Sequence, residues 1–541
     1  MATLGLAAEE GSCELSISLS SGIIMSSSFR AKLLTRNFLA NITAQIIPPL
    51  LSVALVPIYL RYLGIESFGL IGFLFAFAAA LNVFTKGINW ALQREVAQRS
   101  HGGAQYPNIP NLLRTYEVAF WVLGIILGAC IAIFSGFFAE NLLQTETLSS
   151  SVVAACILLI SIRIAVVFPV SIYSGLLVGF ERQVLNNAIL TSIHIAGSVI
   201  TVTFVVLYQT VIVFFLVELL QACIGMLVLR YWAYKITKKE YQNKPSVDLA
   251  ELRRLWRESI HLIGTHGIGA VIKTIDRIIL GLLLPLSNVA IYSIGKMGGE
   301  LLSMVYGSYL SSIFPGTCQA ANKNEECIVA NIIIHTKIIW ALMLAISLPI
   351  AIASEDIVAV WTRKPEMVED AAMIMSVFIF GNLFLAINNV IYQSLVALRR
   401  TRQSFIFNIV ALFMMVPAIF LLVSNLGAIG AAWVWVAYGV TGWVFSFILI
   451  APLFTRKQVI DYFRAIVVGA LVATILAIGQ HFISSHFLAG YLLMRLLLAA
   501  LLFLVIIIFI MLIEFGYDGF ISQRRLYMQA KKNVHEIRNK K

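Results

Sequence analysis

The chain has 541 residues, of which 60% are hydrophobic and only 12% are charged. Soluble domains of ordinary composition carry about 25% charged residues, so this composition excludes an ordinary water-soluble fold. The net charge of +12 would suggest nucleic acid binding in a soluble protein. In a membrane protein, basic residues instead accumulate in cytoplasmic loops, and we therefore expect no nucleic acid partner.

Fourteen apolar segments follow one another along the chain, and each is long enough to cross a bilayer. Backbone polar groups in lipid need internal partners, so we predict that every segment is a helix. The approximate spans are 38–60, 68–90, 114–137, 151–178, 186–207, 210–231, 259–283, 289–314, 329–352, 369–397, 405–424, 427–451, 464–483 and 488–514. The expected fold class is therefore an all-α polytopic membrane protein with about fourteen transmembrane helices.

Basic residues are distributed unevenly between the two sides of this bundle. The N-terminal segment, the even-numbered connections and the C-terminal tail hold most of the 39 Lys and Arg residues. The odd-numbered connections hold few, and they contain the acidic residues Glu140, Glu146, Glu355 and Asp356. The positive-inside rule therefore predicts that both termini are cytoplasmic.

Two halves of six helices resemble each other. The junction YLRYLGIESFGLIG, from Tyr59, matches RIILGLLLPLSNVAIYSIG, from Arg277. At nearly the same offset, YSGLLVGFERQVLNN from Tyr173 matches YQSLVALRRTRQSFIFN from Tyr392. Six helices per half preserve the orientation, so we predict a parallel repeat with a cavity between two lobes.

This organisation divides the chain into six parts. They are a disordered N-terminal extension (1–32), an N-lobe with helices one to six (33–231), a cytoplasmic linker (232–258), a C-lobe with helices seven to twelve (259–452), two further helices (453–515) and a basic cytoplasmic tail (516–541).

Motifs for enzymatic chemistry are absent from the sequence. It contains no Walker A motif, no G-x-S-x-G and no H-E-x-x-H. Its six cysteines form no C-x-x-C pair, and none lies beside a suitable His cluster. We therefore expect a protein that is not an enzyme, with no catalytic residues, no metal site and no cofactor.

Ionisable residues inside apolar segments are the candidate functional residues, because a charge at membrane depth costs about 2.5–3.5 kcal/mol on insertion scales. The basic residues predicted to bind substrate in a central cavity are Lys86, Arg163, Lys273, Arg277 and Lys296. Their acidic neighbours Asp276, Glu300 and Glu218 are fewer, and this surplus of positive charge suits an anionic ligand.

Other roles remain open for several of these residues. Lys86 lies near a helix end, where it could instead extend toward the headgroups. The charges of helices seven and eight could form internal ion pairs that hold helices together. Glu218 and His194 stand alone in the sequence and could couple transport to an ion or contact a neighbouring helix.

Four segments carry a family resemblance. They are RNFLANITAQIIPPLLSVALVPIYLRYLGIESFGLIGF from Arg36, TIDRIILGLLLPLSNVAIYSIGK from Thr274, YQSLVALRRTRQS from Tyr392 and LGAIGAAW from Leu426. In this order they resemble the polysaccharide-transporter branch, the Wzx-type O-antigen flippases, of the multidrug/oligosaccharidyl-lipid/polysaccharide exporter (MOP) superfamily. The resemblance covers roughly residues 33–515.

The resemblance implies two six-helix lobes of the MATE type, two additional C-terminal helices and a cationic central cavity. It also implies a flippase that moves lipid-linked, usually undecaprenyl-pyrophosphate-linked, oligosaccharides across the bacterial cytoplasmic (inner) membrane. Such transport serves the biosynthesis of O antigen, a part of lipopolysaccharide, or of exopolysaccharide. The expected partners are an anionic lipid-linked oligosaccharide, membrane lipids, a polysaccharide polymerase and a chain-length regulator.

Two alternative functions compete with this expectation. The first is an ion-coupled exporter of small cationic drugs from a sister branch of the superfamily, which predicts an acidic cavity. The second is a membrane scaffold of a glycan-assembly complex that transports nothing, which would not need charges at membrane depth.

Overall fold

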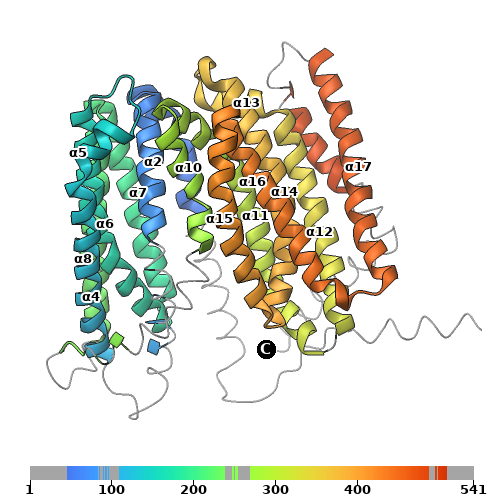
Figure 1. Cartoon of the computed structure of the whole chain (residues 1–541), viewed down its shortest axis with the longest axis horizontal. Coiled ribbons are helices and arrows are strands. Elements are labelled where there is room, and N and C mark those ends of the chain that lie inside the picture. The colour runs from blue at the N-terminus through green and yellow to red at the C-terminus, as the bar shows by residue number, and fades with distance from the viewer. Residues whose placement is uncertain are drawn as a thin grey trace, which may run out of the picture.

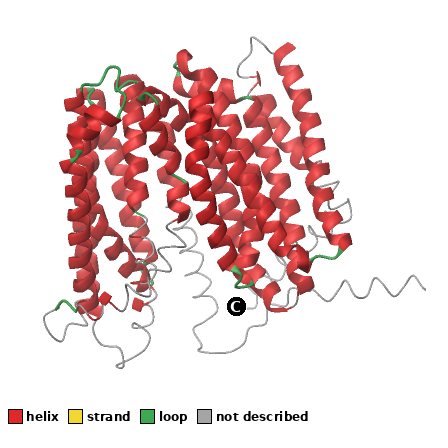
Figure 2. Cartoon of the chain, viewed as in Figure 1, coloured by secondary structure: helices red, strands yellow, loops and turns green. Residues whose placement is uncertain are grey.

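The computed structural model describes residues 46–82, 109–237, 268–323, 325–486 and 497–508, with short pieces at 85, 89, 92–93, 95–96, 246–248, 250, 252–253 and 494–495. Within these residues the secondary structure is helical and contains no strand (Figure 2). The predicted segments 1–32 and 516–541 lie outside the described residues.

The helices of the first half follow the predicted order. They are Ile46–Tyr62, α2 (Ile65–Leu81), α4 (Ile109–Ile133), the short α5 (Ser135–Phe137), the π-helical turn η3 (Phe138–Leu142), α6 (Ser150–Gly179), α7 (Gln183–Tyr208) and α8 (Val211–Thr237).

The second half adds two helices after its own six. Its elements are α10 (Ile275–Leu283), α11 (Leu286–Lys323), α12 (Glu325–Ile352), α13 (Ser354–Thr362), η5 (Pro365–Met367), α14 (Val368–Ala397), α15 (Thr401–Leu426), α16 (Ala428–Ile450), η6 (Ala451–Leu453), α17 (Arg456–His486) and the helix Leu497–Ile508.

Each of the fourteen predicted segments overlaps one of these helices, and nine of the helices described are long and apolar enough to cross a membrane. Two differ clearly from the prediction. The segment 259–283 is interrupted at Thr274, which lies outside helical geometry and whose hydroxyl donates to the Ala270 carbonyl. The helix predicted at 289–314 continues to Lys323, because its polar end can extend beyond the bilayer into water.

The helices form two lobes (Figure 1). In the N-lobe, α6 packs against α4 and α8, and α7 packs against α8. In the C-lobe, α14 packs against α11, α12 and α16, while α17 lies outside α12, where the Trp340 indole donates to the Ile466 carbonyl at 2.9 Å. Helices α2 and α10 lie between the lobes and contact each other.

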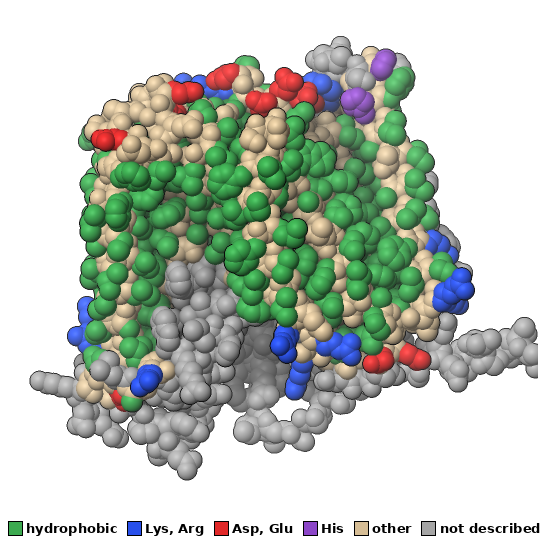
Figure 3. Space-filling model, in the orientation of Figure 1, with side chains coloured by type: hydrophobic (Ala, Val, Ile, Leu, Met, Phe, Trp, Pro, Cys, Tyr) green, Lys and Arg blue, Asp and Glu red, His purple; other side chains and the backbone are tan. Residues whose placement is uncertain are grey.

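Charge distinguishes the two ends of the molecule, which are separated by a broad hydrophobic belt (Figure 3). We call the end that holds Glu66, Glu140, Glu355 and Glu369 the acidic end. The opposite end, which holds Arg182, Arg230, Arg399 and Arg456, is the basic end.

The lobes contact each other closely at the acidic end. A Cβ placed on Gly69 of α2 would lie 1.8 Å from the carbonyl oxygen of Leu286 in the C-lobe, so only glycine fits there. The backbone N–H of Leu286 donates to the carbonyl of Gln144 in the N-lobe at 3.2 Å. These contacts close the acidic end above a pocket that lies deeper between the lobes.

Candidate functional site

A pocket of about 410 Å³ lies between the two lobes. Its lining comes from the first helix, α2 and α6–α8 of the N-lobe, and from α10 and α11 of the C-lobe. Apolar and aromatic side chains form most of its wall, including Tyr59, Phe75, Phe214, Met297 and Met304. The ionisable side chains in this wall are Arg163, His194, Glu218, Arg277 and Glu300.

One Arg–Glu pair belongs to the N-lobe wall. Arg163, near the middle of α6, places Nη2 at 3.4 Å from Oε2 of Glu218 on α8. Its guanidinium carbon lies 4.9 Å from the ring centroid of Phe75, within range of a cation–π interaction. The interpretation of Glu218 as a solitary carboxylate was therefore wrong, because its partner lies on a different helix.

A second Arg–Glu pair belongs to the C-lobe wall. Nη2 of Arg277, on α10, lies 3.3 Å from both carboxylate oxygens of Glu300 on α11. The Arg277 side chain is 17% exposed and the Glu300 side chain is 43% exposed. Both arginines therefore approach one pocket from opposite lobes, and each is accompanied by a glutamate.

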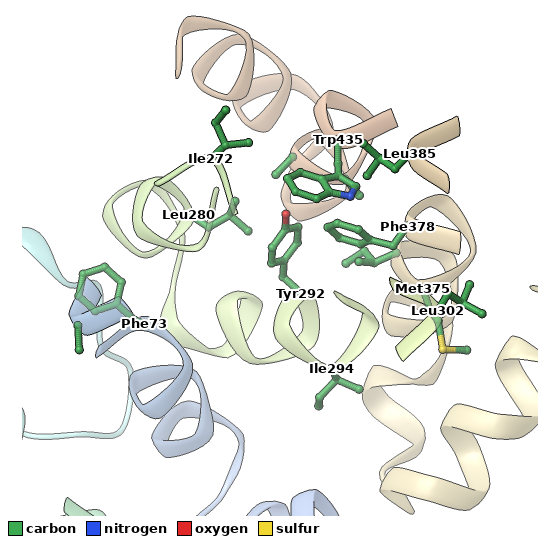
Figure 4. Close-up of a cluster of buried hydrophobic side chains, with 14 of the residues drawn as sticks. Phe73, Ile272, Leu280, Tyr292, Ile294, Leu302, Met375, Phe378, Leu385 and Trp435 are labelled. Carbon is green, nitrogen blue, oxygen red and sulfur yellow. The ribbon is translucent and has the colours of Figure 1, made fainter. Parts of the chain in front are cut away.

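Lys296 does not line this pocket. Its side chain is fully buried, and its ammonium donates to the Asp276 carboxylate and, at 2.9 Å, to the Lys273 carbonyl. The ring centroids of Trp435 and Phe378 lie 5.0 and 5.5 Å from Nζ, and both rings belong to the buried cluster in Figure 4. The prediction that Lys296 lines the cavity was therefore wrong. Lys296 instead points toward Asp276 and forms an internal ion pair with it.

The ion-pair partner of Asp276 is not one of its basic neighbours in the sequence, Arg277 or Lys273. Asp276 instead accepts the Tyr292 hydroxyl at 2.6 Å in addition to the Lys296 ammonium. The side chain of Lys273 is exposed and is not part of the pocket wall. Lys86 lies outside the described residues.

The charges of the described pocket lining are balanced, with two arginines and two glutamates. The predicted surplus of positive charge is therefore not present in this wall. Each arginine nevertheless keeps an unused donor, because the buried Nε atoms of Arg163 and Arg277 have no hydrogen-bond partner among the described residues. A guanidinium with free N–H groups can bind phosphate in a two-point geometry.

Sequence reasoning missed the apolar part of the pocket. Phe75, Phe214 and Met297 carry no distinguishing signal, because aromatic residues and methionine occur throughout these segments. His194 was identified, and its Nε2 is buried in the wall without a partner among the described residues.

Comparison with known proteins now identifies the family. A family model described as "Polysaccharide biosynthesis protein" matches residues 34–321, which is more than half of the chain. The chain belongs to this family. The MatE family model matches residues 265–421 of this chain. No curated protein sequence matches it.

Solved structures show the same fold. The lipid II flippase MurJ, in an inward closed conformation, has a TM-score of 0.65 and 14% identity, over 87% of this chain and 98% of MurJ. An inward-facing multidrug resistance MATE transporter of the MOP superfamily has a TM-score of 0.59 and 16% identity, over 77% and 98%. A mutant of the Vibrio cholerae MATE transporter VcmN has a TM-score of 0.53 and 12% identity, over 81% and 100%.

These matches confirm the resemblance to the MOP superfamily and the fold class of two helical lobes followed by two helices. The family and the structural neighbours are transporters and flippases rather than enzymes. The chain is a multi-pass membrane protein of this superfamily.

Proposed function

We propose that this protein is a flippase that moves an undecaprenyl-pyrophosphate-linked oligosaccharide across the bacterial cytoplasmic membrane, for the biosynthesis of a surface polysaccharide such as O antigen. The observation that carries the proposal is the pair of arginines, Arg163 and Arg277, which line one pocket from opposite lobes. Each presents a buried Nε donor that no described residue satisfies.

A diphosphate would bind between these two guanidinium groups. Glu218 and Glu300 hold the arginines while the pocket is empty, and a diphosphate oxygen would displace each carboxylate. Because the two arginines belong to different lobes, a bound diphosphate would be released when the lobes move apart. The lipid tail would stay in the bilayer and pass between the lobes.

The pocket volume limits what this conformation can hold. About 410 Å³ is typical of a small-molecule site, enough for a diphosphate and the adjoining sugar. A longer glycan would extend out of the pocket, and it would do so toward the basic end because the acidic end is closed by the α2–α11 contact.

A second candidate function is supported by the same balance of charges. Glu218 and Glu300, together with Phe75 and Phe214, would suit a small organic cation. This candidate is an ion-coupled multidrug exporter, and it requires the glutamates rather than the arginines.

The flippase proposal predicts that Arg163→Ala and Arg277→Ala each lower the flipping rate by about tenfold or more, since each removes a charge-assisted contact to the diphosphate. The purified protein is reconstituted in vesicles with an undecaprenyl-pyrophosphate-linked oligosaccharide. Flipping is measured as the fraction of glycan that becomes accessible to a membrane-impermeant glycosidase. Arg456→Ala, at the basic end and outside the pocket lining, is the matched control.

Normal flipping by both arginine variants would contradict the proposal. The competing exporter is tested in the same vesicles with ethidium as the transported cation. Loss of ethidium transport in Glu218→Gln and Glu300→Gln, with no glycan flipping by the parent protein, would favour that exporter. Absence of both activities in the folded parent protein would favour a scaffold.

A further inference from the structure

A second cavity, of about 450 Å³, lies at the acidic end of the C-lobe. Residues of α13 and α14 form one side of it, while the end of α17 and Arg495 form the other. It shares no lining residue with the pocket between the lobes. Because α14 begins and α17 ends here, the cavity lies at the ends of spanning helices, the depth at which lipid headgroups are found.

The lining of this cavity carries more negative than positive charge. Glu355, Asp356 and Glu369 contribute three carboxylates, against the one guanidinium of Arg495. Asp356 Oδ1 lies 2.8 Å from Arg495 Nη2, so this pair satisfies itself. Glu355 and Glu369 form no ion pair with any residue that the structure describes. The two glutamates therefore leave charge available to a ligand.

A buried amide provides an independent sign that the cavity accepts a ligand. Gln480 of α17 lines the cavity and is only 3% exposed. Its Oε1 accepts no hydrogen bond within the described part of the chain. A buried carbonyl oxygen without a donor is unfavourable, and a ligand with N–H or O–H groups would satisfy it.

The arrangement of acceptors does not suit a metal ion. Among the described residues, no group of three or more His, Cys, Asp or Glu side chains is placed to hold one. The free acceptors are instead distributed over a cavity large enough for an organic group. Such a site matches a primary ammonium, which donates three hydrogen bonds and carries positive charge.

We propose that this cavity binds the primary ammonium group of an organic ligand, with Glu355 and Glu369 as its charge partners and Gln480 as an additional acceptor. Two sources share this chemistry, an ethanolamine phospholipid of the adjoining leaflet and an amino sugar. Both ligands also carry oxygen atoms that can accept a hydrogen bond from Nε of Arg495, which has no partner among the described residues. The inference does not depend on the proposed flippase activity, since the two cavities are separate.

Lipid binding is tested on the full-length protein by native mass spectrometry, with phosphatidylethanolamine, phosphatidylcholine or phosphatidylglycerol added to the detergent solution. Phosphatidylcholine is the informative comparison, because it keeps the phosphate and the positive charge but has no ammonium N–H. We expect about tenfold stronger retention of phosphatidylethanolamine, lost in the double variant Glu355→Gln/Glu369→Gln. Glu366→Gln is the control, since Glu366 lies at the same end, is exposed and does not line the cavity.

The amino-sugar source is tested with glucosamine against N-acetylglucosamine, which lacks the ammonium. A rise in thermal midpoint with glucosamine alone, lost in the double variant, would assign the ligand as a sugar. A preference for phosphatidylethanolamine that the double variant loses would assign it as a lipid. The proposal is overturned when neither ligand is preferred, or when a preference survives in the double variant. Both glutamates are exposed, so the double variant is expected to fold.

Discussion

Glu117 of α4 accepts hydrogen bonds from four side chains, although only 2% of its side chain is exposed. The donors are Arg114 on the same helix, Tyr173 on α6, and Arg230 and Tyr234 on α8, at 2.5–2.9 Å. A buried carboxylate is tolerated only when it is paired and hydrogen-bonded. This one residue therefore links three helices of the N-lobe near the basic end.

Replacing this carboxylate should destabilise the N-lobe strongly. Glu117→Ala leaves two tyrosine hydroxyls and two guanidinium groups without their acceptor. Both arginines are partly exposed and can turn to water, so we expect a cost of about 3 kcal/mol rather than more. The thermal midpoint of the detergent-solubilised protein should fall by several degrees. Glu140→Ala, at an exposed position of the same lobe, should leave it unchanged.

The Lys296–Asp276 pair should show the behaviour of a buried ion pair. Lys296→Met alone leaves the buried Asp276 carboxylate without its cation, and Asp276→Asn alone leaves Lys296 with only the Glu300 carboxylate at 3.9 Å, so each should cost about 3–5 kcal/mol. The double variant Lys296→Met/Asp276→Asn removes both charges, so its thermal midpoint should lie above that of either single variant. Additive losses in this double-mutant cycle would contradict a direct pair.

Sequence reasoning at this scale located residues but not their partners. Five candidate residues stand out in the sequence because their surroundings are apolar. The structure places all five in the lining of one pocket, namely Arg163, Arg277, Glu218, Glu300 and His194. Their pairing depends on how helices face each other, which a single sequence does not encode. The spacing of Lys296 and Glu300 allows a pair along one helix, and their charged atoms do lie 3.9 Å apart. Shorter contacts nevertheless join different helices, from Lys296 to Asp276 on α10 and from Glu300 to Arg277.

At the scale of elements, α2 and α11 determine how closely the lobes approach. Gly69 faces the Leu286 carbonyl, and a Cβ on Gly72 would lie 3.5 Å from the Cβ of Ser293. Two small residues one turn apart thus allow α2 to pack directly on α11. Hydropathy predicted both helices, but it could not show that these glycines form the contact between the lobes.

The geometry at Gly72 permits a direct test of this contact. A Cβ–Cβ distance of 3.5 Å is within the range of protein disulfides, so Gly72→Cys/Ser293→Cys should form a disulfide under mild oxidation. A mobility shift on a non-reducing gel, reversed by dithiothreitol, would report it. The two single-cysteine variants are the controls. They are needed because five native cysteines in the described residues are free and could also react with an introduced cysteine.

The sequence predicted where helices occur better than it predicted where they break or extend. Every predicted span overlaps a described helix, because about 20 consecutive apolar residues leave few other solutions in lipid. The break at Thr274 was not predicted, since this residue is neither proline nor glycine. The extension of α11 to Lys323 was missed because hydropathy measures the apolar stretch and not the helix that continues past it.

For the whole molecule, the proposed function requires a second arrangement in which the acidic end, closed in this structure, opens. Under the proposed function, the Gly72→Cys/Ser293→Cys disulfide holds the lobes closed there. Flipping in vesicles should fall at least tenfold on oxidation and return on reduction. Unchanged flipping by the fully crosslinked protein would show that the α2–α11 contact need not separate during transport.

Under the proposed function, the two Arg–Glu pairs also determine how transport would respond to a membrane voltage. Each guanidinium is neutralised by a carboxylate, so the described wall of the empty pocket carries no net charge. The step that returns the empty protein to its starting conformation would therefore move little charge through the electric field. A bound diphosphate would make the loaded pocket negative. Carrying one negative charge outward across a membrane that is negative inside releases about 2.3 kcal/mol per 100 mV. The potential would then accelerate the loaded step alone and give transport its direction.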